Sequence, residues 1–410
     1  MANNNDNKVL NVPHLRFPEF SGEWKMCTIG ELTTKVGSGV TPRGGEAVYK
    51  TEGHPFVRSQ NVGLGNLLLD DIAFIDEETH LRQKSTELQF NDVLLNITGA
   101  SIGRSALVDK QIVGGNVNQH VCIIRTKENL VPSFICSFLL SNYGQRQIDS
   151  FQAGGNRQGL NFEQIKSIKI TIPSKDEQIK IAKLLRAIDE RIATQNKIIE
   201  KLQSLIKGLN DHILKNIEGD QVCFADLGEA YGGLSGKSGD DFGCGDPFIT
   251  YMNVYQNTYI SENDYELVQI APDEKQNSVQ YGDALFTLSS ETPEEVGMGA
   301  VYLGKSQKLY LNSFCFGVHF HGNRVLPQYI AHFISSTSFR KAIYPLAQGS
   351  TRFNLQKQDF MRMKFVLPSL EEQKRIATAL DALYNHLANE KLLTEQYLLL
   401  KQYLLQQMFI

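Results

Sequence analysis

The sequence predicts an α+β protein in which two similar globular domains, strand-rich with some helices, are separated by two long helices that form an antiparallel coiled coil. Three observations predict this fold class. The chain of 410 residues matches itself at a shift of about 195 residues. Each copy opens with short apolar runs between glycine-rich turns, and each copy closes with apolar residues at heptad spacing. A period this long indicates a duplicated domain rather than a solenoid repeat.

The duplication is clearest near the middle and the end of the chain. Gly154–Leu160 aligns with Gly349–Leu355, and the same register continues without a gap from Pro173–Ala182 to Pro368–Ala377. Upstream, the match persists with small shifts. The chain therefore contains an internal pseudo-twofold repeat.

The repeat divides the chain into five segments. They are an N-terminal tail (1–20), a first globular domain (21–150), a central helical region (151–219), a second globular domain (220–345) and a C-terminal helical region (346–410). Each globular domain should contain a helix near Pro132–Ser141 or Pro327–Ser336, because a proline without its N–H is tolerated in the first turn.

The first long helix shows a strict heptad, in which apolar residues occupy positions a and d. The predicted core consists of Ile181, Leu185, Ile188, Ile192, Ile199, Leu202, Ile206, Leu209 and Ile213. Gln195 is the polar exception in this seam, and such a residue commonly fixes the register of a coiled coil.

The second long helix begins with the same spacing and then shifts. Its first core residues are Ile376, Leu380, Leu383 and Leu387. The apolar pattern resumes, out of step, at Leu393, Tyr397, Leu400 and Leu404. This offset predicts a stammer, which would overwind the coiled coil locally.

The link between the two copies determines how the helices pair. Glu218–Asp220 is too short to let the second domain return, so the second helix should run back antiparallel to the first. The 33 residues from Ile181 to Ile213 span about 50 Å. This length exceeds the roughly 34 Å of one B-DNA turn, so the rod suits a reader of two separated half-sites.

Charge argues against an autonomous, tight DNA binder. The net charge is −4, and residues 220–345 carry 7 basic and 15 acidic side chains. Residues 21–150 carry 12 basic and 14 acidic side chains, whereas the two helical regions are slightly basic. Because phosphate neutralisation needs local lysine and arginine, a partner protein would have to supplement DNA affinity.

Composition also bounds the cellular location. The chain has no apolar run near the ~20 residues that span a bilayer, and its start lacks the features of a signal peptide. Six scattered cysteines without metal-like spacing are expected to be small buried residues of a reduced protein. We therefore expect a cytoplasmic protein.

Two sequence features resemble a known family. The opening segment Pro13–Trp24, and the twin Pro-x-x-x-Glu-Gln-x-x-Ile-Ala segments at Pro173–Ala182 and Pro368–Ala377, are similar to those of specificity subunits of type I restriction–modification systems. The resemblance covers essentially the whole chain. The two-copy architecture makes it far more specific than either short motif.

The resemblance implies a function and a set of partners. Each globular domain would be a target recognition domain that reads one half of a bipartite, asymmetric sequence in double-stranded DNA. The helices would set the spacer and dock two methyltransferase subunits, which methylate adenine with S-adenosylmethionine. Restriction subunits would add an ATP- and Mg-dependent motor and nuclease. This chain itself would hold no cofactor and no metal.

A search for catalytic motifs favours a non-catalytic chain. Gly232–Ser238 resembles a phosphate-binding loop, but Tyr231 stands where the motif needs its first glycine. Asp246-Pro247-Phe248 resembles part of an amino-methyltransferase motif but lacks the second proline. The nine histidines show no metal-ligand spacing, and no nucleophile lies in a recognisable elbow.

Candidate DNA contacts are polar residues in glycine-flanked loops, because arginine can pair with guanine and asparagine or glutamine with adenine. In the first domain they are Arg58, Gln60, Asn61, Asn96, Thr98, Ser101, Arg104, Asn118 and Gln119. In the second domain they are Tyr251, Asn253, Ser289, Ser290, Thr292 and Asn312. Arg157 and Arg352 recur at equivalent positions, which favours a shared role in phosphate contact or in domain–helix packing.

Other interpretations remain open at this stage. Any one of these loop residues could simply be solvated or form a turn. The same rod could belong to a non-catalytic scaffold that binds proteins through two heads, or to an unrecognised enzyme. Partner docking is expected on the helix faces outside the seam and on the loops Gly154–Arg157 and Gly349–Arg352.

Overall fold

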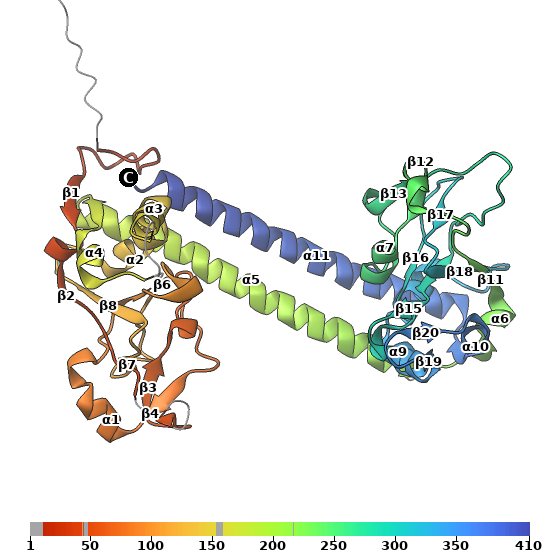
Figure 1. The fold of residues 1–410 in the computed structure, drawn as a ribbon, viewed down its shortest axis with the longest axis horizontal. Helices are drawn as coiled ribbons and strands as arrows, with labels where there is room; N and C mark the ends of the chain where they lie inside the picture. Colours follow the sequence, from red (N-terminus) through yellow and green to blue (C-terminus); the bar gives the residue numbers. More distant parts are fainter. Residues whose placement is uncertain (1–10, 43, 45–47, 153–158, 216) are drawn as a thin grey trace, which may run out of the picture. The chain divides into compact units, whose positions relative to one another are not determined.

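A computed structural model describes residues 11–42, 44, 48–152, 159–215 and 217–410, with the side chains at 213–215 left aside. The chain forms two compact units, unit 1 (1–196 and 392–410) and unit 2 (197–391). Each unit combines one globular domain, called domain 1 or domain 2 below, with one part of each long helix (Figure 1). Among the described residues, no helix has the length and apolar character that crossing a membrane requires.

Domain 1 is built on two sheets and a short ribbon. The four-stranded antiparallel sheet has the order β2-β8-β5-β6, and a three-stranded sheet has the order β4-β3-β7. The strands are β1 (Lys25–Thr28), β2 (Thr33–Ser38), β3 (His54–Val57), β4 (Ala73–Ile75), β5 (Val93–Asn96), β6 (Ser105–Leu107), β7 (Asn116–Val117), β8 (Val121–Thr126) and β9 (Lys169–Ile172). The helices are α1 (Glu77–Arg82), α2 (Pro132–Leu140), α3 (Asn142–Ser150) and α4 (Phe162–Ser167).

The central strand β5 is buried along its whole length because both of its faces are covered. Val93 and Leu95 point into a core shared with α2 and with the long helices, while Leu94 points into a second core. This alternation follows from the two-residue period of a strand. As predicted, α2 begins at Pro132, and Ser141 caps the next helix by accepting a hydrogen bond from the Gly144 N–H.

Domain 2 repeats this plan within unit 2. Its four-stranded sheet has the order β11-β18-β14-β16, and its three-stranded sheet has the order β13-β12-β17. The strands are β10 (Asp220–Cys223), β11 (Gly228–Gly232), β12 (Phe242–Ile249), β13 (Tyr265–Val268), β14 (Ala284–Thr287), β15 (Ser289–Ser290), β16 (Gly299–Val301), β17 (Tyr310–Leu311), β18 (Cys315–Phe320), β19 (Ala347–Gln348), β20 (Phe353–Leu355) and β21 (Lys364–Leu367). The helices are α6 (Phe224–Leu227), α7 (Tyr251–Gln256), α8 (Pro327–Ile334), α9 (Thr337–Ile343) and α10 (Lys357–Met361).

The duplication predicted from sequence is confirmed down to single contacts. Strand β5 pairs with β8 in domain 1 as β14 pairs with β18 in domain 2. At the start of each inner strand a buried aspartate contacts an arginine or a histidine of the neighbouring strand. Asp92 bonds Arg125 at 2.7 Å, and Asp283 meets His319 at 2.6 Å.

A two-stranded ribbon precedes each long helix. In domain 1, β1 pairs with β9, and in domain 2, β10 pairs with β21. Strand β9 falls inside the segment 151–219 that the sequence assigned to the helical region, yet its partner strand belongs to the globular domain. The ribbon therefore joins the first and last strands of each copy directly at the base of its helix.

The long helices are α5 (Lys175–Lys215) and α11 (Leu370–Gln407), and they pack against each other in both units. In unit 1, Asp189 forms an ion pair with Lys401 at 2.6 Å, and Arg191 bonds the Tyr397 hydroxyl at 3.3 Å. Residue numbers rise along α5 as they fall along α11, so the pairing is antiparallel, as predicted.

Burial follows the predicted seam of α5 and the first part of α11. Ile181, Leu185, Ile188, Ile206, Ile376, Leu380 and Leu387 are buried. Ile192, Ile199, Leu202, Leu209 and Leu383 are half-buried. Gln195 is also buried, as its seam position requires. The Ile213 side chain lies outside the described part of the chain.

The predicted stammer is wrong. Leu400, placed in a shifted seam by the sequence, is exposed. Positions seven residues apart instead continue the heptad unbroken from Leu387 through Thr394 and Lys401 to Met408, and Thr394 and Met408 are buried. A search restricted to apolar residues could not see this, because a threonine and an ion-paired lysine occupy the continuing heptad.

The twin Pro-x-x-x-Glu-Gln motifs fasten each domain to its helix. Gln178 is buried; its amide oxygen accepts the Val131 N–H at 2.9 Å, and its amide nitrogen donates to the Asn129 and Pro173 carbonyls. Gln373 makes the equivalent bonds to the Leu326 N–H and to the Arg324 and Pro368 carbonyls. One buried amide thus joins the turn before α2 or α8 to the first turn of the long helix.

The opening segment Pro13–Trp24 anchors the same junction in unit 1. The Arg16 guanidinium bonds both carboxylate oxygens of Glu177, at 2.7 and 2.8 Å, and this bidentate contact raises the pKa of Arg16. Trp24 is buried against Phe134, with ring centroids 6.0 Å apart. The two sequence motifs are therefore parts of a single joint.

We predict that Gln373→Ala destabilises the full-length chain by about 1–3 kcal/mol, because the substitution leaves one N–H and two carbonyls without their partner. Urea denaturation followed by circular dichroism measures the change. Gln402→Ala, at an exposed position of α11, serves as the control and should leave the urea midpoint unchanged. Equal midpoints for Gln373→Ala and the wild-type chain would contradict the fastening role.

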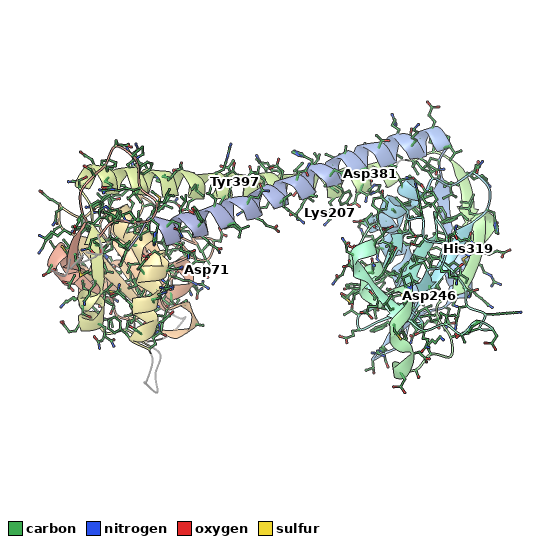
Figure 2. The ribbon with its side chains drawn as sticks, turned by 90° about the horizontal axis from the view of Figure 1, so that it is seen from above. Asp71, Lys207, Asp246, His319, Asp381 and Tyr397 are labelled. Atoms are coloured by element: carbon green, nitrogen blue, oxygen red, sulfur yellow. The ribbon has the colours of Figure 1, made fainter. Side chains whose placement is uncertain are left out.

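A second joint in unit 2 contains a buried histidine. His332 of α8 bonds Asp381 of α11 at 2.8 Å, and Asp381, labelled in Figure 2, also accepts the Tyr259 hydroxyl at 2.6 Å. The ring of His332 stacks on Tyr384 at 5.3 Å. Burial lowers the pKa of His332, and the hydrogen bond to Asp381 opposes this shift only in part.

We predict that acid loosens this joint. Because the folded chain holds His332 with a lowered pKa, the unfolded chain binds more protons as the pH falls below about 6.5. The contribution of His332 to stability is therefore full above that pH and is lost on acidification, by at most about 1.4 kcal/mol per pH unit. Urea midpoints between pH 8 and 5 should fall more steeply for the wild-type chain than for His332→Gln, which keeps a donor for Asp381 but does not titrate. Parallel curves would refute this assignment.

Candidate nucleic-acid interface

The first candidate loop of domain 1, Arg58–Asn61, is organised around Asp71, which Figure 2 labels. Asn61 is fully buried; its amide nitrogen donates to the Leu68 carbonyl and to Asp71 at 2.9 and 2.8 Å, and its oxygen accepts the Arg58 N–H. Its amide edge is therefore used inside the loop. These bonds shape the loop, and a contact of Asn61 with DNA stays a prediction.

The two neighbouring candidates are held by the same aspartate. Arg58 donates to the Asp71 carbonyl at 2.6 Å and lies 5.4 Å from the ring centroid of Tyr49. Gln60 donates to the Asp71 carboxylate and is exposed. Gln60 can therefore offer its amide oxygen outward, whereas Arg58 would have to leave Asp71 to reach a base.

The other two loops of domain 1 are tied to the first. Asn96 is buried, and its amide nitrogen donates to the Ser59 carbonyl at 2.8 Å and to Ser101 at 3.1 Å. The Thr98 hydroxyl lies 2.6 Å from Nδ1 of His120, and the buried Asn118 side chain accepts the His120 N–H. The structure thus brings the three predicted loops together into one surface.

The exposed tips of this surface are the groups free to reach a ligand. Arg104 and Gln119 are exposed, and Gln119 lies 3.3 Å from Nε2 of His120. Sequence reasoning missed His120, because a lone histidine beside Gln119 has no motif to mark it. Its position next to the predicted Asn118-Gln119 pair was the one available signal.

In domain 2, four predicted residues line a single hollow of about 350 Å³. They are Tyr251, Ser289, Ser290 and Arg352. The remaining lining residues were missed by the sequence search and are Met252, Tyr255, Glu291, Glu295 and Phe314. That search favoured amide and hydroxyl side chains, which all of these residues except Tyr255 lack.

The remaining candidates of domain 2 support this hollow. Asn253 is buried and bonds the Ser261 backbone through both its amide atoms, as Asn61 does in its own loop. The Asn312 side chain accepts the Phe314 N–H at 2.9 Å, and Thr292 donates to Glu295 at 2.9 Å. These residues shape the walls of the hollow.

Hydrogen bonds fix the protonation of two groups in the hollow. The Tyr255 hydroxyl donates to Glu295 at 2.6 Å, and this bond raises the pKa of Tyr255 and lowers that of Glu295. Burial raises the pKa of Tyr251, whose hydroxyl donates to the Ser289 carbonyl at 2.8 Å. Near neutral pH the tyrosines are therefore protonated and Glu295 is ionised.

Arg352 is exposed at the rim of this hollow, three residues after Gly349. Gly349 adopts a positive φ of 138°, and an added Cβ would lie 2.0 Å from the Arg352 carbonyl oxygen, so the turn requires glycine. Its counterpart Arg157, with the loop Gly154–Arg157, lies outside the described residues, so the shared role of the two arginines stays a prediction.

The structure gives two resembling motifs other roles. Lys237 lies near the end of the loop that resembles a phosphate-binding motif. It forms an ion pair with Glu274 and donates to the Gln269 carbonyl. The hydrogen bond from Lys237 lowers the pKa of Glu274 to about 2. Asp246-Pro247-Phe248 lies within strand β12. Within the part of the chain that the structure describes, no group of three or more histidine, cysteine, aspartate or glutamate residues could hold a metal ion.

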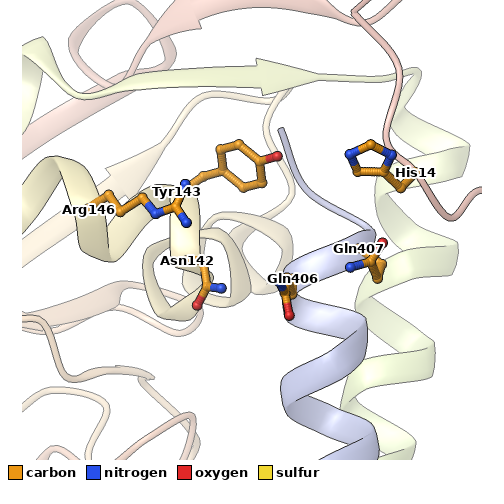
Figure 3. A pocket seen from close by; sticks show the side chains of 6 residues that line it. All are labelled: His14, Asn142, Tyr143, Arg146, Gln406 and Gln407. Carbon is orange, nitrogen blue, oxygen red and sulfur yellow. The ribbon is translucent and has the colours of Figure 1, made fainter.

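A further hollow lies in unit 1, beside the end of α11 (Figure 3). It encloses about 180 Å³ between Asn142, Tyr143 and Arg146 of α3, Gln406 and Gln407 of α11, and His14 of the N-terminal segment. None of its lining residues belongs to the candidate loops of domain 1. We therefore leave it out of the candidate nucleic-acid interface.

The fold defines a class of protein in which two similar globular domains are combined with two long helices. Comparisons with known proteins agree with this class. The chain matches the family described as type I restriction modification DNA specificity domain, over residues 21–204 and again over 237–396. These two matches cover most of the chain. The chain therefore belongs to this family.

Individual relatives match over nearly the full length. The type I restriction enzyme EcoKI specificity subunit of Escherichia coli strain K12 is 23% identical over 88% of this chain and 82% of its own. The putative type I restriction enzyme MjaX specificity subunit of Methanocaldococcus jannaschii is 21% identical over 92% and 90%. The crystal structure of a type I system S subunit from M. genitalium covers 97% of this chain and 99% of its own, with a TM-score of 0.57 and 15% identity.

Proposed function

We propose that this chain is the DNA sequence-specificity subunit of a type I restriction–modification complex, in which each domain reads one half of a bipartite, asymmetric site. One observation carries the proposal. The two domains keep the same loop framework, with buried Asn61 or Asn253 in one loop and Asn118 or Asn312 in another. The side chains at the loop tips nevertheless differ, as a pair of readers of two different sequences requires.

The chain is non-catalytic and supplies recognition. We propose that methyltransferase subunits bring S-adenosylmethionine and adenine methylation, and that restriction subunits bring ATP, Mg and cleavage. The net charge of residues 220–345, which hold 7 basic and 15 acidic side chains, supports this division. Partner subunits would provide most of the phosphate contacts, while the loops of this chain read bases. Such a complex would act on DNA in the cytoplasm.

An apolar stripe on α11 in unit 1 offers a docking face for a methyltransferase subunit. Leu392, Leu399 and Tyr403 are 55%, 64% and 53% exposed. Spacings of seven and four residues place the three side chains on one face of the helix, outside the seam. Exposed apolar residues grouped in this way mark interaction sites on soluble proteins.

The long helices are proposed to set the spacer between the two half-sites. Helix α5 runs for 41 residues without interruption, about 60 Å at 1.5 Å per residue. A helix held along its length by a continuous heptad is a stiff element, which suits a spacer of fixed length.

Exchange of a domain tests the reading function. Replacing residues 21–150 with the corresponding domain of a relative, within the complete complex, should change one half of the methylated sequence and leave the other half intact. Methylome sequencing of cells that carry the exchanged subunit measures this, and cells that carry the native subunit are the control. A change in both halves, or in neither, would sink the modular assignment, and a scaffold that binds only proteins would give no sequence-specific methylation.

Substitution of the stripe tests the docking face. Leu399→Glu combined with Tyr403→Glu should weaken binding of the methyltransferase subunit about tenfold or more, because charge replaces two apolar contacts. Binding of the full-length chain to the purified subunit is measured by isothermal titration. Ala187→Glu introduces one such charge at an exposed site of α5 and should have little effect. Wild-type affinity in the double variant would contradict docking of the methyltransferase subunit on this stripe.

A further inference from the structure

The hollow of domain 2 presents large apolar side chains to solvent. Phe314 is 57% exposed and Met252 is 47% exposed, and both line the hollow. Tyr251 and Tyr255 stack beside them with ring centroids 6.0 Å apart. Apolar surface gathered in a hollow, within a domain of high negative charge, points to a ligand with an apolar group.

Domain 1 provides an internal comparison for each of these positions. The Asn118 side chain holds the His120 N–H, and the Asn312 side chain holds the Phe314 N–H in the same way, so His120 and Phe314 are equivalent. Gln60 directly precedes the buried Asn61, and Met252 directly precedes the buried Asn253. Gln60 and Met252 are therefore equivalent as well. The same framework therefore carries polar tips in one domain and apolar tips in the other.

The contacts of the two aligned residues show the same contrast. His120 takes part in hydrogen bonds with Thr98 and Gln119, whereas Phe314 offers a ring face and edge. The backbone of Ser289 pairs with that of Asn354 in β20, and the backbone of Thr98 pairs with that of Gly159 in the same way. The strand pairing beside the two loops is therefore also equivalent. The domains therefore differ in side-chain chemistry at these positions, and Met252 lies in α7 whereas Gln60 lies in a short 3-10 turn.

In the major groove, thymine is the only base that presents an apolar group, its C5-methyl. Resting on the function proposed above, we propose that domain 2 selects thymine by packing this methyl group against Phe314 and Met252. A phosphate is a poor alternative occupant, because Glu291 and the ionised Glu295 line the same hollow. Arg352 at the rim can orient the duplex through a neighbouring guanine or phosphate.

Replacement of thymine by deoxyuridine tests the proposal, because it removes only the methyl group. Once methylome sequencing has given the site, duplexes are made with deoxyuridine in the half read by domain 2, and the thymine opposite the methylated adenine is left unchanged. The complete methyltransferase complex should methylate these duplexes with a kcat/KM about fourfold lower for each methyl group that domain 2 contacts. This is the loss expected when the contact of one apolar carbon is removed.

Variants of this chain connect that loss to the hollow. With Phe314→Ala or Met252→Ala, thymine and deoxyuridine duplexes should be methylated with nearly equal kcat/KM. His120→Ala, the matched substitution in domain 1, should retain the preference for thymine in the half read by domain 2. Both apolar side chains are largely exposed, so the variants should fold, and a thermal melt of each complex checks this.

Two kinds of failure are distinguishable. The inference is overturned if that half-site holds no thymine outside the methylated pair, if deoxyuridine has no effect, or if the preference survives in both apolar variants. In each of these cases the domain exchange would still change one half-site, and the proposed function would stand. A complex without any sequence-specific methylation would overturn the proposed function and this inference with it.

Discussion

The rest of the structure depends on one buried amide in each copy. Gln178 and Gln373 each hold three backbone groups, two at the turn that leads into α2 or α8 and one directly before the long helix. A buried amide with all its bonds made is costly to rearrange, because any movement leaves polar atoms without partners. The orientation of each globular domain on its own helix is therefore fixed locally.

Each domain separates residues that hold the loops from residues that can read a ligand. Asn61, Asn96, Asn118 and Asn253 are buried, and they bond backbone or neighbouring polar groups, as does the half-buried Asn312. The tips are exposed and differ between the copies. This arrangement lets the tips change without loss of the framework, because the framework does not depend on them.

The sequence was sufficient for the architecture and insufficient for the site. The duplication and the heptad of α5 depend on periodicities that survive in a single sequence, and both are confirmed by the strand pairing and by the burial of the seam. The second half of α11 was misread because Thr394 and Lys401 occupy its heptad, and Lys401 is acceptable there through its ion pair with Asp189. The sequence could not show that the amides of Asn61, Asn96 and Asn253 are already bonded, because it gives residue type and not hydrogen bonds. Phe314 and Met252 were missed because an apolar residue in a loop has no signature until its exposure is known.

The polar members of the α11 seam also constrain how the two long helices can evolve. Lys401 bonds both Asp189 on the neighbouring helix and the Leu64 carbonyl of domain 1. A single side chain of α11 therefore contacts both α5 and domain 1. A slip by one heptad would place Lys401 opposite Ala182 or Asn196 instead of Asp189, and both charges would lose their partner. Insertions or deletions in one helix alone would therefore be disfavoured, whereas matched changes of whole heptads in both helices would keep this ion pair.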